Sequence, residues 1–118
     1  MPNTSHDIDP AAFAAKATEV AGVLRALGNP RRLAILCRLA ETGEATVGTL
    51  AEAVGLGQSA LSQHLARMRR EGVVAFRRDA QTLWYRIDDR RVAALMTELY
   101  RLYCRSDDPS DHTQEDLR

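Results

Sequence analysis

Apolar residues recur at helical spacing along the first third of the chain. Between residues 10 and 27 they collect on one helical face, at Phe13, Ala17, Val20, Ala21, Leu24 and Leu27. Gly28 ends this helix, and Asn29-Pro30 supplies an N-cap and a first helical residue for the next one. The second helix is predicted from Pro30 to about Glu41, with an apolar face at Leu33, Leu36, Cys37 and Ala40.

Two shorter helices are predicted after a turn at residues 42–44. Thr46 can cap the first, which carries apolar residues at Val47, Leu50, Ala51 and Val54 and breaks at Gly55-Leu56-Gly57. The second begins at Gly57 or Gln58, turns Leu61, Leu65 and Met68 inward, and stops at Gly72. Two short helices joined by a tight glycine-containing turn are typical of a helix-turn-helix motif.

The pattern changes from helical to strand-like after Gly72. Residues 73–78 and 82–87 predict two strands joined by a polar turn at 79–81. Asp88 can cap a last helix reaching about Arg105, whose apolar stripe is Val92, Leu95, Met96, Leu99, Leu102 and Tyr103. The predicted fold is mainly α with a β-hairpin wing: a winged helix-turn-helix of four helices, a hairpin and a fifth helix.

Length and patterning together predict one domain that completes its core in a second copy. We expect the domain over residues 10–105, between a flexible tail at 1–9 and a flexible acidic tail at 106–118. The first and last helices each carry an apolar face that lies outside the helix-turn-helix. This predicts a homodimer joined through the terminal helices.

The formal net charge is zero, but the charges are unevenly placed along the chain. Residues 58–91 hold eight arginines against four carboxylates, a net of +4, while residues 106–118 hold five carboxylates against one arginine, a net of −4. A basic middle segment can present a positive face to nucleic acid even though the total cancels. No nucleophile–base set, phosphate loop or carboxylate pair indicates an enzyme.

Nothing in the sequence indicates a membrane protein. The N-terminal residues MPNTSHDIDP are polar, and no apolar run approaches the length of a membrane span. We therefore expect a cytoplasmic protein, in which thiols are usually kept reduced.

The chain resembles the ArsR (arsenic-repressor-like) family of bacterial winged-helix repressors. Three segments carry the resemblance: LRALGNPRRLAIL (24–36), LAEAVGLGQSALSQHLARMRREGVV (50–74) and RRDAQTLWYRI (77–87). They cover most of residues 20–104. The resemblance implies a homodimer that blocks a promoter while bound to double-stranded operator DNA and leaves when an inducer reaches a sensor site.

By position, the resemblance also implies a set of DNA contacts. On the recognition helix these are Gln58, Ser59, Ser62 and Gln63, because Gln can pair with adenine and Ser with base edges or phosphates. His64 follows this contact face and is also expected to contact DNA. Farther along the helix and in the wing, the expected contacts to the backbone or minor groove are Arg67, Arg77, Arg78 and Gln81. The alternatives are a solvated helix face, packing of His64 within the motif, and pairing of Arg77 with Asp79.

The metal sites typical of the family have no counterpart in this chain. The family's cysteine motif falls on residues 44–50, which contain no Cys, and the last helix contains no His. His6, His64 and His112 lie in the two tails and the recognition helix, where they cannot easily converge on one ion. We therefore expect no metal and no cofactor.

Two cysteines, Cys37 and Cys104, are the candidate sensor. The resemblance implies that the second and last helices pack near one another, and a Cys on each matches the family's sulfide-responsive branch. We also expect Tyr100 and Tyr103 to line a pocket near Cys104, with packing in the core as the alternative. The alternative for Cys37 is simple packing on an apolar face beside Leu33 and Leu36.

The resulting hypothesis is a transcriptional repressor that senses persulfide or polysulfide. Cross-linking Cys37 to Cys104 would lower its affinity for the operator. Three alternatives stay open: a repressor that senses peroxide through a disulfide, a winged-helix regulator without its own sensor, and a winged helix that binds protein instead of DNA.

Overall fold

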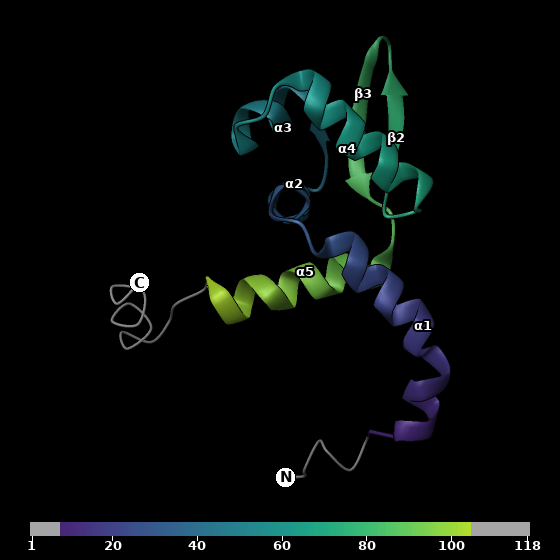
Figure 1. The fold of residues 1–118 in the computed structure, drawn as a ribbon. Helices are drawn as coiled ribbons and strands as arrows, with labels where there is room; N and C mark the ends of the chain where they lie inside the picture. The colour runs from purple at the N-terminus through teal and green to yellow at the C-terminus, as the bar shows by residue number, and fades with distance from the viewer. Residues whose placement is uncertain (1–7, 105–118) are drawn as a thin grey trace.

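The computed structural model describes residues 8–104 of the chain (Figure 1). Its element order confirms the predicted winged helix-turn-helix and adds one short strand. The elements are α1 (Pro10–Leu27), α2 (Pro30–Thr42), β1 (Ala45–Thr46), α3 (Val47–Val54), α4 (Gln58–Arg70), β2 (Val74–Asp79), β3 (Thr82–Ile87) and α5 (Arg90–Tyr103).

Local caps determine where most helices begin. The Asn29 side chain accepts the N–H of Arg31 at 2.9 Å at the start of α2, and Thr46 accepts the N–H of Thr49 at 3.2 Å at the start of α3. Both caps confirm the sequence prediction, because a cap depends only on the few residues around it. Residues 1–7 and 105–118, which include most of the predicted N-terminal tail and all of the predicted C-terminal tail, lie outside the described residues.

The predicted start of the last helix is wrong by one residue. Asp89, not Asp88, caps α5, and its carboxylate accepts the N–H of Arg91 at 2.8 Å. Asp88 instead donates its N–H to the carbonyl of Val73 at 2.8 Å, which keeps it at the end of the hairpin. The helix ends at Tyr103, two residues before the predicted end.

The wing is a three-stranded antiparallel sheet in the order β1-β3-β2. Arg77 of β2 lies opposite Trp84 of β3, and Thr46 of β1 pairs with the same Trp84 from the other side. The strand β1 was not predicted. The hairpin turn is also tighter than expected, because Asp79 already pairs with Thr82 and leaves only two residues in the turn.

The core lies where α2 meets α3, α5 and the sheet. It confirms the inward face predicted for α4, since Leu61, Leu65 and Met68 are all fully buried. The predicted face of α2 is partly wrong. Ile35 and Leu39, which were not predicted, are buried. Of the predicted residues, Leu33 and Cys37 are only half-buried and Ala40 is exposed. The contacts of α2 with α3, α5 and the sheet therefore bury a stripe of the helix that is rotated from the predicted one.

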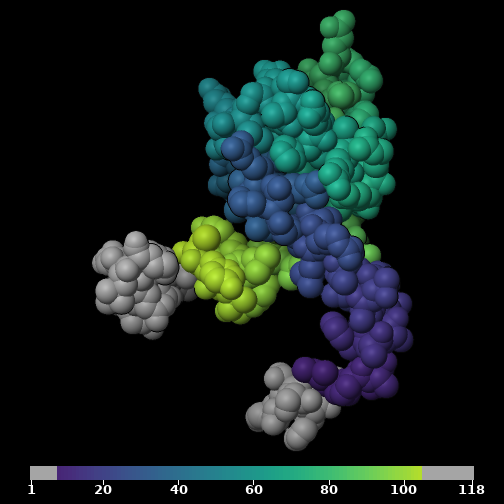
Figure 2. Space-filling model, in the orientation of Figure 1, coloured from purple at the N-terminus to yellow at the C-terminus, as the bar shows by residue number. Residues whose placement is uncertain are grey.

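The helix α1 projects away from this core. In Figure 2 its N-terminal part, in purple, extends from the body of the molecule. Only Leu27 of α1 is buried, while Phe13 and Leu24 keep 58% and 54% of their surface exposed. The radius of gyration is 16.8 Å, against about 13 Å for a compact domain of about 100 residues. The apolar face predicted for α1 is therefore uncovered in the single chain.

Candidate functional site

The helix-turn-helix consists of α3, a three-residue turn and α4. Gly55 ends α3 in the left-handed region with a φ of 72°, and Leu56 donates its N–H back to the carbonyl of Ala51 at 3.1 Å. Gly57 then occupies the N-cap of α4 in an extended conformation. This turn positions α4 across α3 and leaves one side of α4 free of the core.

The side chains predicted to contact bases all lie on the exposed side of α4. Gln58, Ser59, Ser62 and Gln63 are exposed, opposite the buried face of the same helix. His64 is half-buried at the edge of this side, and Arg67 is exposed and lies 3.4 Å from the carboxylate of Glu71. The arrangement offers amide and hydroxyl groups that can hydrogen-bond to base edges in a major groove.

The predicted wing contacts separate into two groups. Arg78 and Gln81 are exposed near the tip of the hairpin. Arg77 instead donates two hydrogen bonds to the carboxylate of Glu44, at 2.8 and 3.0 Å, and lies 5.6 Å above the ring of Trp84. The hydrogen bonds from Arg77 lower the pKa of Glu44. The alternative partner expected for Arg77, Asp79, is therefore wrong: the ion pair is with Glu44.

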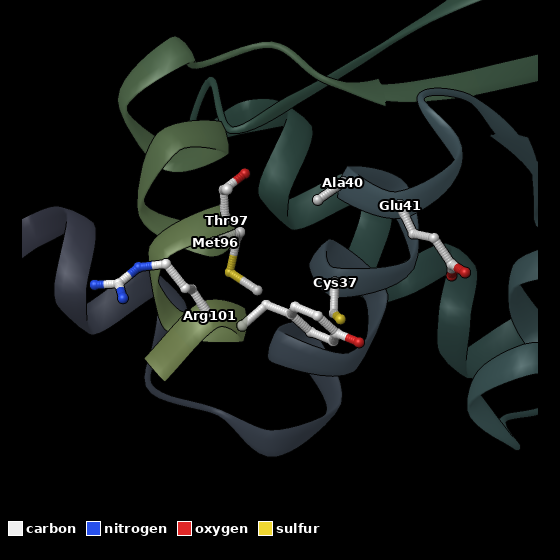
Figure 3. A pocket seen from close by; sticks show the side chains of 7 residues that line it. Cys37, Ala40, Glu41, Met96, Thr97 and Arg101 are labelled. Carbon is white, nitrogen blue, oxygen red and sulfur yellow. The ribbon is translucent and has the colours of Figure 1, made fainter. Parts of the chain in front are cut away.

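Cys37 faces a cavity between α2 and α5 (Figure 3). The cavity measures about 590 Å³ and is lined by Cys37, Ala40, Glu41, Met96, Thr97, Tyr100 and Arg101. The side chain of Cys37 is half-buried and that of Cys104, the residue that ends α5, is exposed; both are free thiols. Tyr100 lines the cavity as expected, whereas Tyr103 does not and remains 75% exposed.

Several residues around these sites were not identified from the sequence. Met96 and Thr97 line the cavity beside Tyr100, because a spacing of three to four residues puts them on the same face of α5 as that residue. Helical spacing from the predicted Tyr100 could have identified both. Glu44 gave no such signal, because it lies 33 residues from Arg77.

Within residues 8–104, no three side chains of His, Cys, Asp or Glu are grouped so that they could hold a metal ion. His6 and His112 lie outside the described residues. In the same part of the chain, no helix has the length and apolar character needed to cross a membrane.

Comparisons with known proteins agree with this geometry. Residues 29–75 match the family described as bacterial regulatory protein, arsR family. The chain is 48% identical over 84 residues to the transcriptional activator HlyU of Vibrio cholerae, covering 71% of this chain and 77% of that protein. It is 43% identical over 90 residues to the regulator YgaV of Escherichia coli, covering 76% and 91%.

A solved structure extends the likeness to the whole winged helix. The crystal structure of the transcriptional repressor BigR from Xylella fastidiosa superimposes with a TM-score of 0.77 at 36% identity. The match covers 84% of this chain and 100% of that one. The chain therefore belongs to the arsR family of bacterial regulatory proteins and is a DNA-binding transcriptional regulator, not an enzyme.

Proposed function

We propose that this protein is a homodimeric repressor that senses persulfide or polysulfide through Cys37 and Cys104. The observation that carries the proposal is the position of the two thiols. The chain has only two cysteines. One lines the cavity between α2 and α5, and the other ends that same α5. A link between them would join the helix beside the helix-turn-helix to a terminal helix.

The uncovered apolar side chains support the dimer. Large apolar side chains are exposed on α1, at Phe13 and Leu24, and near the end of α5, at Leu102 and Tyr103. Several large apolar side chains exposed on two terminal helices are typical of surfaces that become buried in an interface. A two-fold dimer would place two copies of α4 about 34 Å apart, one turn of DNA, so that Gln58, Ser62 and their neighbours meet two half-sites.

The sensing step exchanges sulfur without any other oxidant. The Cys37 thiolate attacks the outer sulfur of glutathione persulfide, forming a cysteine persulfide and releasing glutathione thiolate. A second glutathione persulfide extends the chain by one sulfur and releases another glutathione thiolate. The Cys104 thiolate then attacks the middle sulfur and expels hydrosulfide, leaving a trisulfide bridge. Two thiols and two persulfides thus give one trisulfide, two glutathiones and one hydrogen sulfide.

A bridge with inserted sulfur suits thiols on different helices. A direct disulfide requires Cα atoms within about 4.4–6.8 Å, whereas each added sulfur atom relaxes that limit. This favours persulfide over peroxide, which can form only the direct disulfide. The bridge would fix α5 against α2 and change the placement of the two α4 helices. A hundredfold loss of DNA affinity needs a coupling of only about 2.7 kcal/mol.

The test combines mass spectrometry with DNA binding. The reduced protein first selects an operator from a random duplex pool, and its affinity is then followed during treatment with glutathione persulfide. We expect release of the operator together with a bridge carrying one or two extra sulfur atoms between Cys37 and Cys104. Hydrogen peroxide at the same dose serves as the comparison oxidant.

Matched variants make the test specific. Cys37→Ser and Cys104→Ser should bind the operator normally and no longer respond to persulfide. Ala40→Ser adds a hydroxyl to the same cavity without removing a thiol and should respond like the wild type. Full induction of Cys37→Ser would contradict the proposal. Release by peroxide alone, with a direct disulfide, would favour the peroxide-sensing alternative.

A further inference from the structure

A second hollow lies on the other side of α2, against α4. It measures about 460 Å³ and is distinct from the cavity at Cys37. Its lining consists of Arg32, Ala60, Gln63, His64, Ala66, Arg67 and Arg70. Three of these side chains are guanidinium groups and none is a carboxylate. The two alanines leave room between the longer side chains, so the hollow combines space with hydrogen-bond donors.

Arg32 supplies an unused donor at this hollow. Its side chain is only 8% exposed, and its Nη1 donates to the carbonyl of Ala26 at 3.1 Å. Its Nε is buried and has no hydrogen-bond acceptor among residues 8–104. A buried charged donor without an acceptor is costly. The Nε of Arg38 is unsatisfied in the same way but lines neither this hollow nor the cavity at Cys37. It is therefore the combination with the open, positively charged space beside α4 that favours an anionic ligand at Arg32.

A neighbouring hollow shows that the charge is specific to this one. Arg32 and Arg67 also line a space next to α1 and α5, but there Glu19, Glu71 and Asp89 contribute carboxylates. Four arginines face three carboxylates in that space, a net charge of +1, whereas three arginines and no carboxylate line the hollow beside α4, a net charge of +3. An anion would therefore enter the hollow at Gln63 and Arg70, not the one at Glu19.

The hollow adjoins the exposed side of α4. Ala60, Gln63, His64 and Arg67 follow one another at intervals of three, one and three residues, which places them along one flank of the helix. Gln63 belongs both to this flank and to the predicted base-contacting set. A DNA backbone that passes α4 would bring phosphate groups to the same flank.

We propose that this hollow binds a backbone phosphodiester of DNA, with Arg32 and Arg70 as phosphate ligands beside Arg67. The proposal deepens the function above, because it rests on the use of α4 as the recognition helix. Arg32 reaches the phosphate from α2, so the helix-turn-helix and the helix before it hold the same strand. Phosphate contacts of this kind fix the position of a protein on the duplex without selecting its sequence.

Arg70 is the residue to change, because Arg32 also holds the end of α1 through Ala26. The measurement is the salt dependence of binding to a duplex of random sequence. The variant Arg70→Gln should reduce the log–log slope by about 0.9, the value for one lost phosphate contact. Arg69→Gln is the matched control. It removes the same charge one residue away, where Arg69 lies 4.7 Å above the ring of Phe76 and does not line the hollow.

Two further measurements separate the outcomes. Equal slopes for Arg70→Gln and Arg69→Gln would overturn the proposal. If the two slopes are equal while inorganic phosphate at millimolar concentration shifts the NMR signals of the His64 ring in wild type but not in Arg70→Gln, the hollow holds a free anion and not DNA. Ser62→Ala tests the recognition helix itself: unchanged affinity for the selected operator would contradict that part of the proposed function, whatever the slopes show.

Discussion

At the scale of single residues, the turn between α3 and α4 depends on the backbone of Gly55. Its φ of 72° lies in the left-handed region, where side chains with a Cβ are disfavoured. A Cβ built at Gly55 would meet no atom within 4 Å. The cost of a side chain there is therefore conformational and not a clash, and it acts on the turn that orients the recognition helix.

We predict that Gly55→Ala lowers the free energy of unfolding by about 1 kcal/mol, the cost of holding an alanine in the left-handed region. Gly48→Ala is the control, since Gly48 lies inside α3 and a Cβ there meets only the Gln58 side chain at 3.8 Å. Alanine favours a helix, so this variant should gain roughly 0.5 kcal/mol. Urea denaturation measures both. A Gly55→Ala protein as stable as the wild type would show that the turn relaxes to another conformation.

Single residues also mark where sequence reasoning succeeds and where it fails. The exposed positions of Gln58, Ser59 and Ser62 followed from helical spacing within α4, a local property. The pairing of Arg77 with Glu44 joins residues far apart in the chain, so no local pattern could reveal it. Arg32 was missed for a different reason: charge predicts exposure, and only the packed fold buries this side chain.

At the scale of elements, a group of three charged side chains joins α1 to the start of α5. Arg91 donates hydrogen bonds to Glu19 of α1 and to Asp89, the N-cap of α5, the latter at 3.3 Å. The hydrogen bonds from Arg91 lower the pKa values of both carboxyl groups. Since α1 makes few other contacts with the body of the molecule, these bonds help to hold its direction.

This ion group gives a pH dependence with a definite sign. Both carboxyl pKa values are lowered by folding, so their contribution is present above the unfolded values near about 4 and is lost as the pH falls through the folded values. We predict that Arg91→Gln raises the NMR titration midpoint of Glu19 more than that of Asp89. The reason is that the carboxylate of Asp89 still accepts the backbone N–H groups of residues 91 and 92 after the change.

Arg90→Gln is the matched control for this titration, because Arg90 is exposed and lies next to Arg91 without being part of the group. It should leave the midpoint of Glu19 close to its wild-type value. An equal rise in both variants would mean that the general positive charge near α5, and not the hydrogen bonds of Arg91, lowers the pKa of Glu19.

The elements themselves were largely predictable, for a physical reason. The limits of α1 and α4 follow the apolar spacing within each segment and the glycines beside it, and both match the sequence prediction closely. The strand β1 could not be predicted, because it has two residues and exists only through pairing with β3, about forty residues later. The sequence prediction placed the cap of α5 at Asp88 instead of Asp89, because the contact of Asp88 with Val73, which fixes the end of the hairpin, exists only in the folded chain.

At the scale of the whole molecule, the two terminal helices extend beyond the winged helix that they flank. Both helices carry exposed apolar side chains. They are Phe13 and Leu24 on α1, and Tyr100, Leu102 and Tyr103 on α5. The sequence predicted these faces, since a helical stripe is visible without the fold. The arrangement of the partner copy could not be predicted, because it depends on surfaces that meet only in the dimer.

We predict that the wild-type protein sediments at twice the chain mass of 13.1 kDa and that Leu24→Glu raises the dimer dissociation constant at least about tenfold. Burying a carboxylate in an apolar interface costs more than the roughly 1.4 kcal/mol that this change requires. A two-fold dimer would carry the substitution twice. Analytical ultracentrifugation measures the effect, and operator affinity should fall with it, because a monomer meets only one half-site.

Ala53→Glu adds the same charge at an exposed position of α3, outside the terminal helices, and should leave the sedimentation unchanged. Comparison of the two variants separates a loss of apolar contact from a change in net charge. If Leu24→Glu sediments like the wild type, the face of α1 that carries Leu24 is not the interface. The exposed end of α5 then becomes the surface on which the two copies meet, and Leu102→Glu should dissociate them instead.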